Sequence, residues 1–323
     1  MRKHAFSLLL VCLVAIVFAC PVAHGDTLHD QISIRSDADL HTGNGVTSGS
    51  GSVDDPYIID DWSIEVSAGA GIEVKNTLAY LIIRNCTIVG KGRTVIGIIV
   101  SQASHVEVNN CKLTDLAKGI FVYQSPTTMV NENACINCIR GIEGTESNTI
   151  SIVGNKIHGT LEHGVFLWRC HDALLANNSI ADSRNGMYLD SCHRDYLRSN
   201  DITNMNHGMF LWDCFDCSIT ENTITDCELG LAIVHTSEGN SIFHNAFLDN
   251  NRSATCDEIS NYWDGGYPAG GNFWSGDPIV DRYSGQDQDH PGADGIRDSP
   301  KEIPFNNVDR YPLVDQPVAK EEG

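Results

Sequence analysis

The sequence predicts an all-β protein: a single-stranded, right-handed parallel β-helix of about eight coils with roughly 22 residues in each coil. Three observations support this prediction. A glycine followed by alternating apolar residues recurs at a nearly fixed spacing, an asparagine recurs at a second fixed place, and no unit contains a helical pattern long enough to compete. Units of this length cannot bury an apolar face alone, so they must stack, and parallel stacking with the usual crossover hand gives a right-handed solenoid.

The chain begins with a segment typical of exported proteins. Residues 1–25 have a basic start at Arg2 and Lys3, then an apolar run, then small residues at Ala23 and Gly25, as in a secretory signal peptide. Lipoprotein processing at Cys20 is an alternative. No later segment has the roughly 18 apolar residues that a membrane span needs. We therefore expect a secreted protein, either extracellular or periplasmic.

The composition excludes two classes of partner. The chain has 323 residues, with 42 acidic against 21 basic side chains and a formal charge of -21. Nucleic acids and anionic membrane surfaces bind clusters of Lys and Arg, which this composition does not favour.

The coils are predicted to occupy residues 71–254, between an N-terminal capping segment, 26–70, and a C-terminal capping tail, 255–323. Solenoid ends expose unpaired strand edges, so capping structure is expected there. In each unit the residues one and three positions after the glycine are apolar, which predicts a strand with these two side chains in the core. The aligned glycines, each expected at a corner, are Gly71, Gly97, Gly119, Gly141, Gly164, Gly186, Gly208 and Gly230.

A second apolar position follows 16 or 17 residues after each glycine, and an asparagine usually stands two residues before it. Stacked inward asparagines can pass hydrogen bonds from coil to coil, which satisfies amides that are otherwise costly to bury. The predicted ladder contains Asn155, Asn178, Asn200, Asn222 and Asn245, with Ala134 as an exception.

Segments outside the strongest repeats resemble a known family. They are GSGSVDDPYIIDDWSIEVSAGAGIEVKNTLAYLIIRNCTI (49–88), NYWDGGYPAGGNFWSG (261–276), PGADGIRDSP (291–300) and DRYPLV (309–314). Together with the repeats they resemble the NosD-like family of periplasmic copper-binding proteins, and the parallel β-helix repeats of carbohydrate-binding proteins and sugar hydrolases. The resemblance implies a secreted or surface β-helix. It also implies a possible role as a copper-handling accessory protein.

Residues two and four positions after each glycine are predicted to point outward from the same strand. They form a stripe of rings interrupted by carboxylates, and a contiguous row of exposed rings marks an interaction surface. We expect the stripe to bind a polysaccharide or glycan, or to pack against another surface protein. The expected ligand-binding residues are Tyr123, Phe166, Trp168, Tyr188, Asp190, Phe210, Trp212 and Asp213.

Catalysis on the same face is an alternative function. A pair of carboxylates can act as acid and base on a glycosidic bond, and Glu143, Asp190 and Asp213 are the candidates for a hydrolase, lyase or epimerase. The sequence lacks the Asp-Asp and Gly-His-Gly patterns of β-helical pectinases and any epimerase pattern. A binding module is therefore the leading prediction, and the question of enzymatic activity stays open.

The sequence contains candidate ligands for two metals, calcium and copper. An acidic, Gly-containing loop with Asp287, Asp289, Asp294 and Asp298 has the oxygen ligands that calcium prefers, although its spacing is not that of an EF-hand. Copper would need the thiol column Cys170, Cys192 and Cys214 with the adjacent His171 and His193. These cysteines stand at an inward position that other coils fill with small residues, so a role as core fillers is the alternative.

Cysteines at less regular positions of the repeat are better candidates for disulfides in an exported protein, without a pairing that the sequence can assign. They are Cys135, Cys138, Cys217, Cys227 and Cys256.

Overall fold

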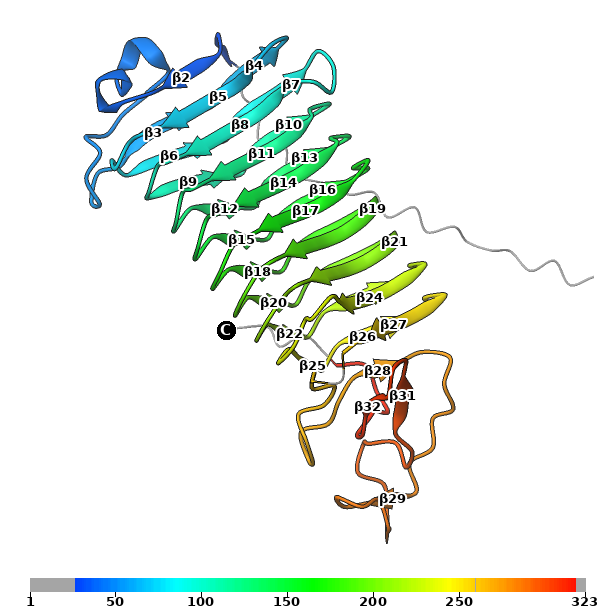
Figure 1. The fold of residues 1–323 in the computed structure, drawn as a ribbon. Helices are drawn as coiled ribbons and strands as arrows, with labels where there is room; N and C mark the ends of the chain where they lie inside the picture. The colour runs from blue at the N-terminus through cyan, green and yellow to red at the C-terminus, as the bar shows by residue number, and fades with distance from the viewer. Residues whose placement is uncertain (1–26, 259, 318–323) are drawn as a thin grey trace, which may run out of the picture.

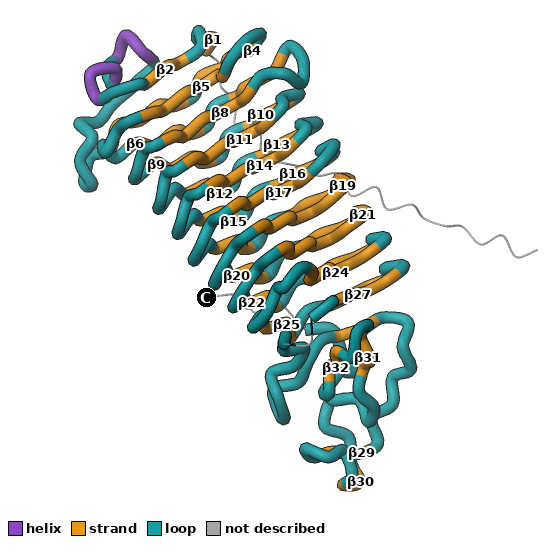
Figure 2. The backbone as a smooth tube through the Cα atoms, in the orientation of Figure 1, coloured by secondary structure: helices purple, strands orange, loops and turns teal. Residues whose placement is uncertain are grey.

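The structure is a computed structural model that describes residues 27–258 and 260–317. The predicted signal peptide, 1–25, and the alternative lipoprotein position Cys20 lie outside the described residues. Within them the chain winds into a parallel β-helix, and the predicted fold class is confirmed (Figure 1). In the described part of the chain, helix is restricted to two short 3-10 turns near its N-terminal end, η1 (Asp37–Asp39) and η2 (Thr42–Asn44) (Figure 2).

Three columns of parallel strands run along the solenoid. The first column carries the repeat glycines and the residues that follow them. Its strands are β2 (Ile32–Ile34), β5 (Ala70–Lys75), β8 (Ile96–Ser101), β11 (Lys118–Tyr123), β14 (Arg140–Thr145), β17 (His163–Trp168), β19 (Ser179–Asp190), β21 (Asp201–Trp212), β24 (Leu229–Val234) and β27 (Arg252–Cys256).

The second column is a nine-stranded sheet with one strand from each coil. The solenoid therefore has nine turns rather than the predicted eight, because the N-terminal segment supplies the first strand of this sheet. The strands are β3 (Tyr57–Asp60), β6 (Leu81–Arg84), β9 (Val106–Asn109), β12 (Met129–Asn131), β15 (Ser151–Val153), β18 (Leu174–Ala176), β20 (Tyr196–Arg198), β22 (Ser218–Thr220) and β25 (Ser241–Phe243).

The third column precedes the first in each coil, and in β19 and β21 the two columns are continuous. Its other strands are β1 (Thr27–Leu28), β4 (Trp62–Val66), β7 (Thr87–Gly90), β10 (Lys112–Thr114), β13 (Ala134–Ile136), β16 (Lys156–His158), β23 (Thr223–Thr225), β26 (Ala246–Leu248) and β28 (Phe273–Trp274). The tail adds two small antiparallel pairs, β29 (Tyr283–Ser284) with β30 (His290–Pro291) and β31 (Lys301–Ile303) with β32 (Asn307–Asp309).

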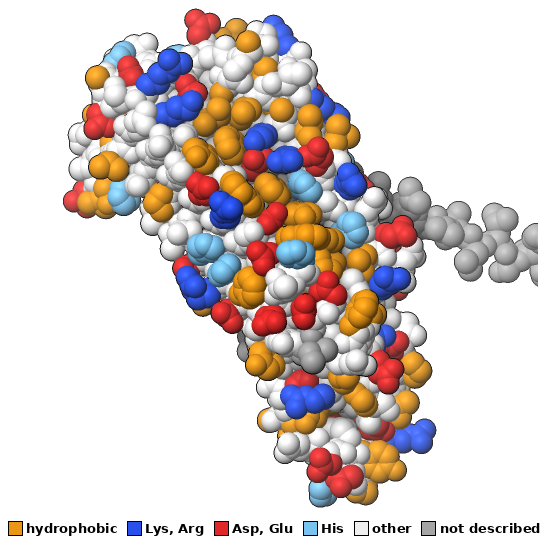
Figure 3. Space-filling model, in the orientation of Figure 1, with side chains coloured by type: hydrophobic (Ala, Val, Ile, Leu, Met, Phe, Trp, Pro, Cys, Tyr) orange, Lys and Arg blue, Asp and Glu red, His pale blue; other side chains and the backbone are white. Residues whose placement is uncertain are grey.

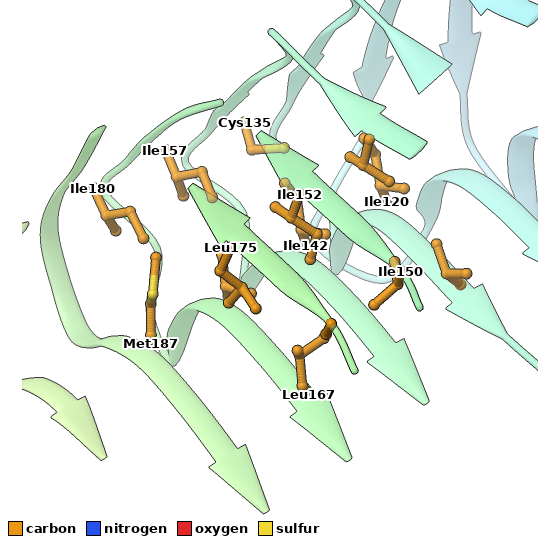
Figure 4. Close-up of a cluster of buried hydrophobic side chains, with 14 of the residues drawn as sticks. Ile120, Cys135, Ile142, Ile150, Ile152, Ile157, Leu167, Leu175, Ile180 and Met187 are labelled. Atoms are coloured by element: carbon orange, nitrogen blue, oxygen red, sulfur yellow. The ribbon is translucent and has the colours of Figure 1, made fainter. Parts of the chain in front are cut away.

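The core is a set of vertical columns of apolar side chains. The residues one and three positions after each glycine are fully buried in most coils, as predicted; Met187 and Leu189 stack on Met209 and Leu211 in register. Figure 4 shows Cys135, Ile157 and Ile180 following one another through the interior. Because equivalent positions superpose about 4.8 Å apart, one buried position in the repeat becomes a continuous column.

One coil is shifted by one residue from the prediction. Cys135, not Ile136, pairs in register with Leu113 and Ile157 and is buried, whereas Ile136 is half-buried. The residue two positions before Cys135 is Asn133, which joins the asparagine ladder in place of the predicted exception Ala134. A single-residue slip inverts which face of a strand a side chain occupies, so the apolar Ile136 misled the alignment.

The repeat glycines do not form corners. Gly186 lies inside β19, and a Cβ there would lie 2.5 Å from the carbonyl oxygen of Gly208 and 2.7 Å from Cγ2 of Ile202. Glycine is therefore required because the next coil approaches too closely for any side chain. The left-handed corner residues are non-glycine residues that follow the first-column strand directly, such as Arg169, Ser191 and Asp213.

All ten cysteines of the described chain are free and buried, so the candidates for disulfides are unpaired thiols in this structure. Cys135 and Cys217 point into the core, where they act as compact apolar fillers.

Candidate functional site

The candidate site is the outward surface of the first strand column, which we call the stripe. Two neighbouring rows of side chains run along it in register. The row nearer the glycines, the Phe row, is Phe121, Glu143, Phe166, Tyr188, Phe210 and Ala232. The row beside it, the Trp row, is Tyr123, Thr145, Trp168, Asp190, Trp212 and Val234. Figure 3 shows apolar side chains gathered over the middle of this face, with basic side chains toward its N-terminal end and acidic ones toward its C-terminal end.

The rings of the Phe row pack against one another. Tyr188 stacks on Phe210 with ring centroids 4.9 Å apart and planes 12° apart, and Phe166 lies 5.7 Å from Tyr188. Each ring is half-buried as a result. Burial also raises the pKa of Tyr188. The ring faces in this row are thus largely occupied by neighbouring rings.

The Trp row differs because large and small residues alternate. Tyr123, Trp168 and Trp212 are separated by Thr145 and Asp190 in successive coils. Trp212 is 37% exposed, and Trp168 is half-buried. Rings two coils apart cannot stack on each other, so this row leaves gaps between its rings.

The N-terminal part of the stripe contains a compact ion-pair network. Glu143, predicted to be exposed, is only 5% exposed because Lys118 Nζ lies 2.7 Å from Oε1 and Arg140 Nη1 lies 2.9 Å from Oε2. Arg140 also pairs with Glu162 at 2.8 Å. Lys118 lies over the ring of Phe121 at 3.9 Å. Both cations occupy the position just before the repeat glycine, so the repeat alignment already placed them on this face.

In the three coils after Arg140, the same position carries a hydrogen-bonded chain of His163, Asn185 and His207. Asn185 Nδ2 donates to His163 Nδ1 at 3.0 Å, and Asn185 Oδ1 accepts from His207 Nδ1 at 2.7 Å. Burial lowers the pKa of His163 to about 4, with Arg140 as a second cause, and burial lowers the pKa of His207. Both imidazoles are therefore neutral at neutral pH. His163 keeps its proton on Nε2, and His207 presents an unprotonated Nε2.

A row of polar residues borders the Trp row at the left-handed corners. Ser191 Oγ donates to Asp190 Oδ1 at 2.7 Å and lies 3.5 Å from Asp213 Oδ2, so the structure brings these two predicted carboxylates to one place. Thr236 Oγ1 donates to Asp213 at 3.1 Å. His235 stacks on Trp212 at 4.4 Å, a contact that the repeat alignment did not single out.

The predicted calcium loop uses its carboxylates within the tail. Asp298 accepts from the backbone N–H groups of Arg282 and Tyr283, and Asp294 accepts from Gly285 N–H and Gln288 Nε2. Asp289 pairs with His290, and Asp287 is exposed. Across residues 27–258 and 260–317 no three side chains of His, Cys, Asp or Glu come together as a metal-binding group.

The thiol column does not fit copper. Cys170, Cys192 and Cys214 are fully buried, and burial raises the pKa of Cys170 and Cys192 well above the usual value. A protonated thiol inside an apolar core is a poor ligand, because metal binding requires the thiolate. His171 and His193 stand outside the core with ring centroids 4.7 Å apart, on the other side of the chain from these sulfur atoms.

Within the described residues no helix is long and apolar enough to cross a membrane.

Comparison with solved structures found similarity to several distant proteins. The A-module of a mannuronan C-5 epimerase from Azotobacter vinelandii is 10% identical, with a TM-score of 0.52 over 79% of this chain and 82% of that one. A periplasmic alginate epimerase is 13% identical, with a TM-score of 0.46 over 82% and 77%. A lacto-N-biosidase from Eubacterium ramulus is 12% identical, with a TM-score of 0.42 over 68% and 55%. At 10% identity, the likeness to the A-module concerns the fold alone.

No curated protein matches the sequence at a significant level. A family model does match, over residues 43–278, and its description is periplasmic copper-binding protein (NosD). The match covers most of the chain, including the first coils and the start of the tail. The chain therefore belongs to the NosD family of parallel β-helix proteins.

Proposed function

We propose that this protein is an exported binding protein that holds a polysaccharide or glycan on the stripe. The observation that carries the proposal is the Trp row, in which exposed or half-buried rings alternate with small or polar residues along one face. Sugar rings have apolar C–H faces that stack on aromatic rings and hydroxyl groups that need hydrogen-bonding partners. Trp168 and Trp212 supply the first kind of contact, and Asp190 and Asp213 supply the second.

The fold suits such a ligand. A flat column of parallel strands presents equivalent positions at a constant spacing, so a linear chain of repeated sugars can meet repeated contacts. The similar A-module is named as an epimerase of mannuronan, which is consistent with a polysaccharide site on a solenoid of this kind. The family description as periplasmic and the predicted signal peptide support an exported location.

The environment of one candidate carboxylate, Glu143, favours binding over catalysis. Glu143 is neutralised by Lys118 and Arg140 and is nearly buried, so it is poorly placed to attack or protonate a substrate. If the protein cleaves or epimerises polysaccharides, incubation will generate new reducing ends, unsaturated products or altered sugar configuration. Such activity, lost in Asp190→Ala and Asp213→Ala, would replace the binding proposal by an enzymatic one.

The test is a glycan array and affinity electrophoresis with the parent protein and two single variants, Trp168→Ala and Trp212→Ala. Each variant is expected to bind the retained glycan roughly threefold to tenfold more weakly, the loss expected for one ring contact. Tyr196→Ala is the matched control, since Tyr196 is 55% exposed on the second strand column. Retention of no glycan by the parent, or equal losses in all three variants, contradicts the proposal; capture of a protein partner through the stripe would replace it.

A further inference from the structure

We infer that the gap between Trp168 and Trp212, above Asp190, is a pocket for a single sugar ring, and that it selects neutral or amino sugars over uronic acids. This inference rests on the proposed glycan binding and specifies where the sugar lies and what charge it carries.

The spacing of the two rings defines the gap. Asp190 is paired in register with Trp168 in the preceding coil and with Trp212 in the following coil. The backbone positions of the two tryptophans are therefore two strand spacings apart, about 9.6 Å. Atoms in van der Waals contact lie about 3.5 to 4.0 Å apart. Two contacts of this length need about 7 to 8 Å and three need about 10.5 to 12 Å, so the spacing admits one ring between the two indoles but not two stacked rings.

The orientation of the indole faces supports the same conclusion. The plane of Trp212 is 13° from that of Phe210, which in turn stacks on Tyr188 of the preceding coil. The faces of these rings are therefore turned along the solenoid axis. His235, in the following coil, covers one face of Trp212 at 4.4 Å and 16°. The opposite face of Trp212 is directed at the gap above Asp190.

On the other side of the gap, an ion pair holds a guanidinium over one face of Trp168. The Arg169 guanidinium lies 4.4 Å from the centroid of the Trp168 ring, and its Nη1 is 3.9 Å from Glu146 Oε1. Glu146 belongs to the preceding coil, so this pair draws the guanidinium away from Asp190. A face of Trp168 is thereby left for a ligand that stacks in the gap.

Among the described residues, the carboxylates beside the gap are not paired with a cation, whereas the Arg169 guanidinium beside Trp168 is paired with Glu146. Asp190 and Asp213 accept hydroxyl groups from Ser191 and Thr236, and within the described part of the chain neither carboxylate forms an ion pair. The whole chain carries a formal charge of -21. A uronate would meet like charge here, whereas a sugar hydroxyl can donate to Asp190 and a protonated amino group can form a charge-assisted hydrogen bond.

Filling the gap tests the pocket directly. Asp190→Trp places a third ring between the two tryptophans, where it can stack as Tyr188 does between Phe166 and Phe210. The matched control is Thr220→Trp, a half-buried outward position on the second strand column. Circular dichroism and thermal melting establish that both variants fold. Asp190→Trp is expected to weaken binding at least tenfold, and Thr220→Trp is expected to bind as the parent does.

The charge preference is measured by isothermal titration of glucosamine oligomers, N-acetylglucosamine oligomers and oligouronates of equal length. We expect binding of the first two and at least tenfold weaker binding of oligouronates. Asp190→Asn should reduce the advantage of the amino sugar severalfold and leave the neutral oligomer nearly unchanged. Tighter binding of oligouronates, or parent-like binding by Asp190→Trp, overturns this inference alone. If no glycan binds the parent, the proposed function fails, and the pocket fails with it.

Discussion

Asp195 is a fully buried carboxyl group among apolar neighbours in the core. Its Oδ1 accepts the backbone N–H of Ala173 at 2.8 Å, while Oδ2 has no hydrogen-bonding partner. Burial raises the pKa of Asp195 to about 7. Because the folded state binds the proton more tightly than the unfolded state does, this residue favours folding most below about pH 4, and its contribution is lost as the pH rises toward 7.

Asp195→Asn should stabilise the protein at neutral pH. In the same row of the core, Asn240 Oδ1 accepts from Cys217 N–H at 2.9 Å and Asn240 Nδ2 donates to the Cys214 carbonyl at 3.0 Å. The amide introduced by Asp195→Asn can bond in the same way and removes the buried charge. We expect the free energy of unfolding at pH 8 to rise by about 1 to 3 kcal/mol, measured by urea denaturation.

The gain should be much smaller at pH 4, where the carboxyl is already protonated. Asp216→Asn, an exposed aspartate at a left-handed corner, serves as the control and should change stability little at either pH. A variant at residue 195 that is less stable than the parent at pH 8 would show that the carboxylate is well solvated in the folded protein.

For single residues, the sequence predicted the direction in which a side chain points better than its degree of burial. Period-two alternation correctly placed Trp168, Asp190 and Trp212 on one surface. It did not predict that Glu143 is buried, because the covering cation Lys118 comes from another coil and only side-chain packing brings it there. The register of a repeat fixes where Cβ atoms point, whereas burial depends on how far neighbouring side chains reach.

At the scale of the elements, the asparagine ladder links seven successive coils. Each Oδ1 accepts hydrogen bonds from the backbone N–H and from the side-chain Nδ2 of the asparagine one coil earlier. Each Nδ2 also donates to the backbone carbonyl of a buried residue in the preceding coil, as Asn200 does to Leu175. The ladder runs through Asn133, Asn155, Asn178, Asn200, Asn222, Asn245 and Asn272. A break at any rung therefore leaves buried polar groups unpaired on both sides.

Asn200→Ala tests the ladder near its centre. The substitution removes the acceptor for Asn178 and the donor to the Leu175 carbonyl, both at a site closed to water. We expect the free energy of unfolding to fall by at least about 3 kcal/mol in chemical denaturation. Thr203→Ala, at an outward position on β21, the strand that begins directly after Asn200, should lose well under 1 kcal/mol. Equal effects of the two substitutions would mean that the ladder adds nothing beyond side-chain volume.

The sequence identified this element because its members recur with the period of the coil. It failed at one rung, where Cys135 fills the apolar position and Ile136, the more hydrophobic-looking choice, points outward. Apolar identity alone cannot decide between adjacent residues of a strand, and here only the register with Leu113 and Ile157 decides.

At the scale of the whole molecule, the C-terminal tail closes the last coil of the solenoid. The tail supplies Asp309, whose Oδ2 accepts the backbone N–H of Asn272 at 2.8 Å and Trp274 Nε1 at 2.9 Å. A Cβ at Gly271 would lie 1.9 Å from Asp309 Oδ1, so the glycine permits this approach. Asp264 holds Arg310 next to it through hydrogen bonds of 2.6 and 2.9 Å. The tail segments that resemble the family thus close the asparagine ladder with a carboxyl group.

The need for a cap was predictable, since an open solenoid exposes unpaired strand edges. The way in which the tail forms this cap was not predictable, because the tail lacks a repeat from which its pairing with the last coil could be inferred. Only the structure shows that residues 261–276 and 309–314, far apart in the sequence, meet at the last coil.

Asp309→Ala is expected to loosen the C-terminal end of the solenoid and leave its centre intact. The substitution leaves the Asn272 N–H and the Trp274 indole N–H without an acceptor in a buried site, a loss of at least about 2 kcal/mol for the local structure. Hydrogen exchange should accelerate in residues 261–274 and 297–313 and stay unchanged in residues 118–212, because a solenoid transmits stability only between neighbouring coils. Asp287→Ala, in an exposed loop of the same tail, should leave exchange unchanged. Faster exchange spread evenly from the first coil to the last would instead mean that the solenoid unfolds as one cooperative unit whose stability depends on this single carboxyl group.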